Sequence, residues 1–103
     1  MSKTVIIQKV KQYAELLKSQ LPVEMIILQK AYAGEEFKKD YEIEVVVVVD
    51  KMDRDYIEVK DELTQLANQV DPHIDPTLIE KDKDDPTGFF EDIRKTGKVI
   101  YKK

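Results

Sequence analysis

Five consecutive valines, Val45–Val49, constrain the fold of this chain more than any other feature of its sequence. Valine is branched at its β-carbon, which disfavours helix and suits the pleated surface of a strand. The run is too short to cross a membrane, and an unbroken apolar run is typical of a strand that is buried on both faces. We therefore predict that Tyr41–Asp50 contains the central strand of a sheet.

Two acids, Glu42 and Glu44, stand at the start of this strand. Strand side chains alternate between faces, so residues two apart project from the same face. Two carboxylates on one face can hold a divalent cation. They can equally be solvated side chains, because strand ends emerge into water and glutamate is seldom buried. Both interpretations stay open at this point.

Length and composition predict one ordered domain over residues 1–103. The chain is 42% apolar and 37% charged, with three glycines and four prolines. Seventeen basic and twenty-one acidic residues give a net charge of -4, which argues against nucleic acid as a generic partner. The absence of cysteine excludes disulfides and thiolate chemistry. No signal-peptide pattern or apolar run of membrane-spanning length occurs, so we expect a cytoplasmic protein without membrane association.

Apolar periodicity predicts two amphipathic helices. Ile6, Val10, Tyr13 and Leu17 recur at spacings of four, three and four, which indicates a helix over residues 2–19. A second stripe follows the central strand and predicts a helix that ends near residues 68–71; its members are Tyr56, Val59, Leu63, Leu66 and Val70.

Three shorter segments complete the predicted fold. Val23–Leu28 is an apolar strand, and the segment up to Glu80 is an irregular or edge strand, because it contains Pro76, which cannot donate to a central ladder. Thr87 is expected to cap a third helix, and residues 98–101 can add a last strand. The pattern predicts an α+β domain in which helices pack on a small mixed sheet of three or four strands.

Several motifs in this order resemble a known family. After the first strand comes Ala-Tyr-Ala-Gly-Glu, which contains Gly34, and then a strand that opens Tyr-Glu-Ile-Glu. Ile74-Asp75-Pro76, Gly88-Phe89-Phe90 and the ending Lys-Thr-Gly-Lys-Val-Ile-Tyr follow. This arrangement resembles the minimal nucleotidyltransferases of the DNA polymerase beta superfamily, in their short bacterial and archaeal form, over Val5–Tyr101.

The chain departs from that family at the catalytic motif. The family carries Gly-Ser after the first strand, where Gln29 and Lys30 stand here. A glycine lets the backbone approach a triphosphate, whereas glutamine places a β-carbon there. The family opens its second strand with two aspartates, which Glu42 and Glu44 replace. Each added methylene moves a carboxylate by ~1.5 Å, in a site where magnesium requires oxygen ligands at about 2.1 Å.

The resemblance implies magnesium-dependent transfer of a nucleoside monophosphate from ATP or another NTP. Glu42 and Glu44 would hold the metal, and Asp75 would complete the carboxylate set, with Asp71 as the next candidate. Asp75 can also be a turn-capping residue before proline. Gln29, Lys30 and Gly34 would lie against the nucleotide. The only histidine, His73, is more typical of a surface residue than of a catalytic base.

The resemblance also implies a non-catalytic alternative. Short members of the family are often paired with a small all-helical partner, frequently as the antitoxin of a toxin and antitoxin system. The departures at Gln29, Lys30 and the two glutamates favour a weakly active or inactive member that acts with such a partner. The alternative is an active enzyme that uses ATP and magnesium. The oligomeric state stays open, and a homo-oligomer is compatible with the sequence.

Overall fold

Six elements make up the part of the chain that the computed structural model describes, which is residues 3–29, 43–50, 53–80, 95 and 97–103. In chain order these are α1 (Lys3–Lys18), β1 (Val23–Leu28), β2 (Ile43–Val49), α2 (Tyr56–Val70), β3 (Ile74–Glu80) and β4 (Lys98–Lys102). The two predicted amphipathic helices and the strand Val23–Leu28 are confirmed. The predicted third helix near Thr87 lies outside the described residues.

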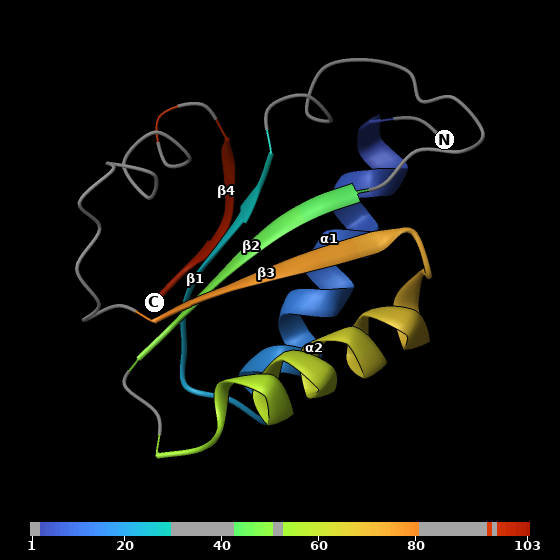
Figure 1. Cartoon of the computed structure of the whole chain (residues 1–103). Coiled ribbons are helices and arrows are strands. Elements are labelled where there is room, and N and C mark those ends of the chain that lie inside the picture. The colour runs from blue at the N-terminus through green and yellow to red at the C-terminus, as the bar shows by residue number, and fades with distance from the viewer. Residues whose placement is uncertain (1–2, 30–42, 51–52, 81–94, 96) are drawn as a thin grey trace.

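The strands form one sheet in the order β3-β2-β1-β4 (Figure 1). β1 runs antiparallel to both β2 and β4, whereas β2 and β3 are parallel and are connected through α2. The sheet is therefore mixed, and the α+β class predicted from the sequence is confirmed. β2 has a neighbouring strand on each side, which confirms that the valine run forms a central strand.

The valine run is buried on both faces of the sheet. Val45–Val49 are between 0% and 3% exposed. Val45, Val47 and Val49 belong to the main core, whereas Val46 and Val48 join Met25 and Ile27 in a second apolar cluster. Since alternate residues of a strand point to opposite faces, burial of both faces requires an unbroken apolar run.

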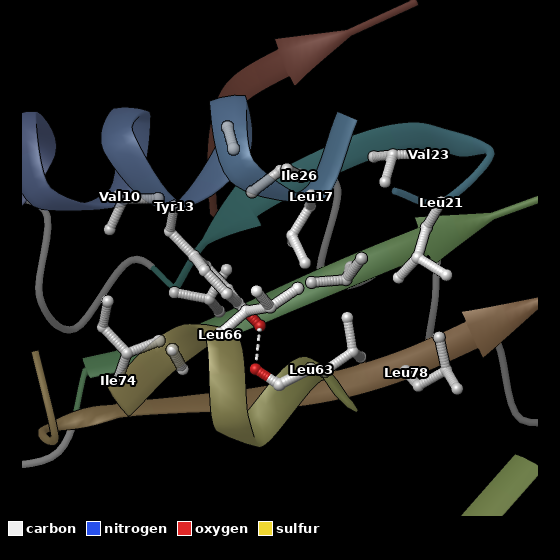
Figure 2. Close-up of a cluster of buried hydrophobic side chains, with 14 of the residues drawn as sticks. Val10, Tyr13, Leu17, Leu21, Val23, Ile26, Leu63, Leu66, Ile74 and Leu78 are labelled. Atoms are coloured by element: carbon white, nitrogen blue, oxygen red, sulfur yellow. Dashed lines mark hydrogen bonds between the residues drawn. The ribbon is translucent and has the colours of Figure 1, made fainter. Parts of the chain in front are cut away.

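Both helices cover the same face of the sheet (Figure 1). Their apolar stripes meet the main core, where Tyr13 of α1 and Leu63 of α2 are 0% exposed. The Tyr13 hydroxyl donates to the Leu63 carbonyl at 2.9 Å, so the buried phenol joins the two helices (Figure 2). Burial raises the pKa of Tyr13, which keeps the phenol protonated. Neither described helix is long and apolar enough to cross a membrane.

β3 is a regular edge strand despite its internal proline. It pairs with β2 over seven positions, from Ile43 and Ile74 to Val49 and Glu80. Pro76 is tolerated because β3 has a neighbouring strand on one side only. The edge strand expected from the proline is thus confirmed, and the irregular alternative is wrong.

Tyr56 departs from the predicted apolar stripe of α2. It is 44% exposed at the first turn of the helix, and its hydroxyl donates to the Leu78 carbonyl at 3.3 Å. The Asp55 side chain caps this turn by accepting from the Ile57 backbone N–H at 2.7 Å. Tyr56 therefore links the start of α2 to β3 instead of filling the core.

Candidate functional site

Glu44 and Asp75 lie side by side on adjacent strands. They are register partners in the parallel pairing of β2 with β3, and parallel strands lie about 4.8 Å apart. Their neighbours Ile43 and Ile74 belong to the main core on the helix-covered face. Alternation therefore directs both carboxylates to the opposite face, and both residues are exposed. The fold brings together two acids that are distant in the sequence.

The end of β1 lies at the same end of the sheet as Glu44 and Asp75. The Gln29 backbone N–H donates to the Glu44 carbonyl at 3.1 Å, and Gln29 is half-buried. Three of the predicted site residues, Gln29, Glu44 and Asp75, therefore meet at one end of the sheet, where β1 ends and β2 and β3 begin. We call this end of the sheet the carboxylate end.

The other predicted site residues, Lys30, Gly34 and Glu42, lie outside the described residues. The expectation that Glu42 shares a face with Glu44 stays a prediction. Within the described part of the chain, no three His, Cys, Asp or Glu side chains are grouped so as to hold a metal. The pair Glu44 and Asp75 nevertheless supplies carboxylate oxygens, and magnesium is commonly held by one or two carboxylates together with waters and phosphates.

Asp75 lies within a strand and does not cap a turn, so the turn-capping interpretation of this residue is wrong. The aspartate that caps a turn is Asp71, which follows α2 directly. Its Oδ1 accepts from the His73 backbone N–H at 2.8 Å, which is the pattern of an Asx turn. Two aspartates that each precede a proline thus have different surroundings, because Asp75 lies in the sheet and Asp71 follows a helix.

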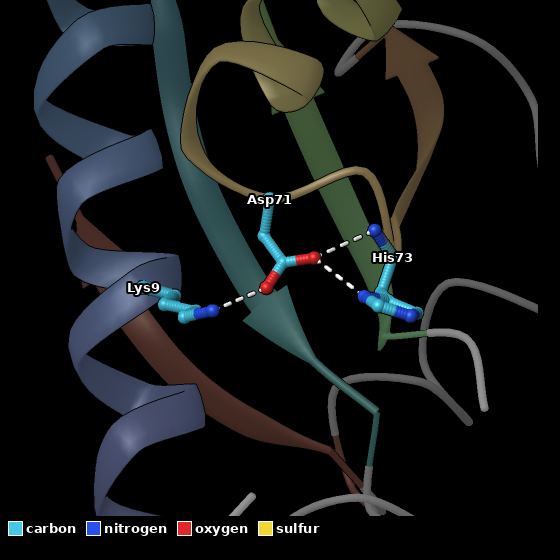
Figure 3. A network of polar contacts seen from close by, with 3 residues as sticks. All are labelled: Lys9, Asp71 and His73. Atoms are coloured by element: carbon cyan, nitrogen blue, oxygen red, sulfur yellow. Dashed lines mark hydrogen bonds and ion pairs between the residues drawn. The ribbon is translucent and has the colours of Figure 1, made fainter. Parts of the chain in front are cut away.

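Asp71 is buried and fully engaged (Figure 3). Its side chain is 5% exposed, Oδ2 pairs with the Lys9 ammonium of α1, and Oδ1 also lies 2.7 Å from the His73 ring Nδ1. Burial alone would raise the pKa of Asp71, but the hydrogen bonds from Lys9 and His73 outweigh it and lower the pKa to about 2. Asp71 is therefore a structural anion rather than a candidate ligand.

The network of Lys9, Asp71 and His73 holds together the elements that form the carboxylate end. The His73 carbonyl accepts from the Ile43 backbone N–H at 2.7 Å, which joins the start of β3 to the start of β2. Lys9 and Asp71 connect the same turn to α1. Sequence reasoning did not single out Lys9, because it is one of several lysines on an amphipathic helix, and its partner is 62 residues away.

Comparison with known proteins supports the fold and leaves the family open. No family model matches the chain, and no curated protein matches it either. Among solved structures, the chain is similar to a chain in the crystal structure of the toxin-antitoxin MntA-HpeT mutant. The likeness has a TM-score of 0.64 and 22% identity, and it covers 100% of this chain and 75% of the other.

The chain has a nucleotidyltransferase-like fold. The fold that the resemblance implied is therefore confirmed, whereas membership of the DNA polymerase beta superfamily stays a prediction. The MntA-HpeT structure is of a mutant in which two aspartates, two positions apart, are replaced by glutamates. Glu42 and Glu44 have the same residue type and spacing.

Proposed function

We propose that this chain acts with a small all-helical protein partner in an antitoxin-like role, and that it is weakly active or inactive in nucleotide transfer. The fold and the toxin-antitoxin setting of the similar structure support the proposal. The observation that carries the proposal is that the backbone N–H of Gln29, at the carboxylate end, already has a hydrogen-bond partner, the Glu44 carbonyl. By the resemblance, the β-carbon of Gln29 would stand where the family's glycine admits a triphosphate.

Gln29 opposes nucleotide binding for two physical reasons. Loops that cradle phosphates present free backbone N–H groups to the anion. At Gln29 this group lies in the sheet, 3.1 Å from a carbonyl oxygen, so it is not available to a phosphate. Gln29, which is half-buried, also carries a side chain at a position where the family has none. Phosphate contacts at this position would therefore have to come from other residues, such as Lys30.

The carboxylates keep the residue types that magnesium chemistry needs. Glu42 and Glu44 would hold a magnesium ion, and Asp75, in register with Glu44, would lie close enough to complete the set and to accept the proton of an acceptor hydroxyl. The bound ion would neutralise charge on the phosphates of ATP. The longer glutamate arms weaken this arrangement without removing it, which is why we propose weak activity or none. The register pairing favours the alternative, an active enzyme that uses ATP and magnesium.

Titration of the purified chain with ATP and magnesium separates the two functions. We expect thermal stabilisation far below the ~2.7 kcal/mol that a ligand gives at a hundred times its dissociation constant. Replacing Gln29→Gly and Lys30→Ser together with Glu42→Asp and Glu44→Asp should strengthen binding more than either pair alone, because metal and phosphates bind as one unit. Saturable, magnesium-dependent binding of micromolar ATP by the parent would instead contradict the degenerate site and favour the active enzyme.

A co-expression experiment tests the antitoxin-like role. The chain would be expressed with the product of a neighbouring reading frame that encodes an all-helical protein, and growth and the mass of that protein would be measured. We expect the Glu44→Gln/Asp75→Asn double variant to restore growth as well as the parent does. If only the parent restores growth, and the partner gains the mass of a nucleoside monophosphate, then neutralisation depends on catalysis and the inactive form of the proposal is wrong.

A further inference from the structure

The two edges of the sheet differ in how their backbone groups are satisfied. β3 forms one edge and β4 the other. Edge strands present a row of hydrogen-bonding groups that another chain can pair with, and proteins usually block one or both of these rows. The chemistry of each edge therefore indicates where an added strand could bind.

Side chains and turns of this chain close the β3 edge. The Lys60 ammonium of α2 donates to the Pro76 carbonyl, and the Tyr56 hydroxyl donates to the Leu78 carbonyl. Pro76 has no N–H to offer, and the Ile74 N–H donates to the Asp71 carbonyl at 3.1 Å. A strand that approached β3 would have to displace contacts with α2, so this edge is protected against pairing.

The β4 edge has no such cover within the described part of the chain. There β4 pairs with β1 alone, and Val99 is 42% exposed. The Lys103 N–H donates inward to the Glu24 carbonyl at 2.9 Å. Because backbone groups of successive strand residues point to opposite sides, the N–H and carbonyl of Lys102 point outward. The outer side of β4 thus offers backbone groups next to an exposed apolar side chain.

The charge of β4 decides what kind of strand it can accept. β4 begins with Lys98 and ends with Lys102, both exposed, on a chain whose net charge is -4. Lys98 is the register partner of Leu28 in the main core and Lys102 that of Met25 in the second cluster, so the bulge in β4 places the two lysines on opposite faces of the sheet. Because β4 carries two lysines and no acid, pairing of two copies through this edge would bring only basic side chains together, which destabilises a pair. A second copy is therefore disfavoured, whereas aspartate or glutamate in the added strand would form opposite-charge pairs.

We propose that the outer edge of β4 binds an extended, acidic segment that lies outside the helices of the protein partner, as a fifth strand of the sheet. Main-chain hydrogen bonds to Lys102 would hold the segment, Lys98 and Lys102 would select acidic residues, and Val99 would contact its apolar ones. The proposal rests on the proposed function in that it names the surface by which the partner is held. The carboxylate end would be free for nucleotide while the partner is bound at β4.

Selection from a displayed library of random twelve-residue peptides tests the chemistry of this edge, with the full chain as the target. We expect enriched peptides in which acidic residues flank an apolar centre, because the two lysines lie at the two ends of β4. We also expect these peptides to shift the backbone amide NMR signals of residues 98–103 selectively. Reversing the charge with Lys98→Glu/Lys102→Glu should weaken their binding at least tenfold. Lys11→Glu, on the exposed side of α1, is the control for charge and should leave binding within twofold.

Two lysine variants separate charge from strand pairing. Lys102→Ala removes the charge, whereas Lys102→Pro also removes the outward N–H and should reduce peptide binding further, while circular dichroism confirms that both variants are folded. Neutral or basic enriched peptides, shifts outside β4, no enrichment, or equal binding by the Pro and Ala variants would overturn the proposal. A dimer of the parent chain that Lys102→Pro dissociates would show that a second copy occupies the edge, which also overturns it.

The co-expression experiment distinguishes this proposal from the proposed function. If Lys102→Pro and Lys98→Glu/Lys102→Glu still co-purify with the helical partner and restore growth, the antitoxin-like role stands and the β4 docking surface is wrong. If the parent fails to restore growth although acidic peptides bind at β4, the proposed function fails and the preference of this edge for acidic strands stands.

Discussion

Replacing Asp71 by asparagine should destabilise the protein in a strongly pH-dependent way. Asparagine has the same shape and still accepts hydrogen bonds from His73, but it cannot carry the charge that pairs with Lys9. The side chain of Asp71 is 5% exposed and that of Lys9 is 30% exposed. The lost interaction is therefore a partly buried ion pair, whose lysine can turn toward water once its partner is neutral.

The lowered pKa of Asp71 determines how much folding free energy the substitution should remove. The network lowers this pKa from 3.8 to about 2 in the folded protein. At ~1.36 kcal/mol for each pKa unit, the difference corresponds to roughly 2 kcal/mol of folding free energy at neutral pH. Because the folded-state pKa is the lower one, this stabilisation is fully present above pH 4 and is lost as the pH falls toward 2. Asp71→Asn should thus cost roughly 2 kcal/mol at pH 7 and much less at pH 2.

Urea unfolding followed by circular dichroism measures this difference at pH 7, 5, 3 and 2. Subtracting the variant from the parent at each pH removes the contribution of the other carboxylates, which titrate in both proteins. Glu15→Gln is the matched control, because Glu15 pairs with Lys18 on the surface of α1 with its side chain 75% exposed. Its loss should change stability by less than about 0.5 kcal/mol at every pH. A difference between parent and Asp71→Asn that is the same at pH 2 as at pH 7 would refute the electrostatic explanation.

Three further outcomes follow from the structure. Leu63→Ala, at a position that is 0% exposed between the helices and the sheet, should lower the free energy of unfolding by about 2–5 kcal/mol in urea titrations, and a loss under 1 kcal/mol would contradict its place in the core. Tyr13→Phe removes only the hydrogen bond to the Leu63 carbonyl, so it should cost about 1 kcal/mol by the same measurement. Gln29→Gly should increase the affinity for ATP and magnesium in calorimetry, and more so when it is combined with Glu44→Asp. An unchanged affinity in that double variant would show that these positions do not limit nucleotide binding.

The sequence alone determined the elements and their faces. The valine run required a strand buried on both faces, and Pro76 indicated an edge strand. The spacing of apolar residues around Tyr13 and around Leu63 placed each of them on the buried face of a helix. These predictions succeeded because side-chain periodicity and the backbone limits of proline are local properties. Tyr56 is the exception: periodicity assigned it to the apolar stripe, but it lies at the first turn, where the helix extends beyond the core.

Only the tertiary structure decided which residues meet. Glu44 and Asp75 are partners because β2 and β3 pair in one particular parallel register, and a shift by one residue would turn one carboxylate into the core. Lys9 and Asp71 form an ion pair across 62 residues, which no local pattern encodes. Register and helix packing are set by how the whole core fills its volume. The grouping of charges at the carboxylate end, and the closing of the β3 edge by Lys60, follow from that packing rather than from any single segment.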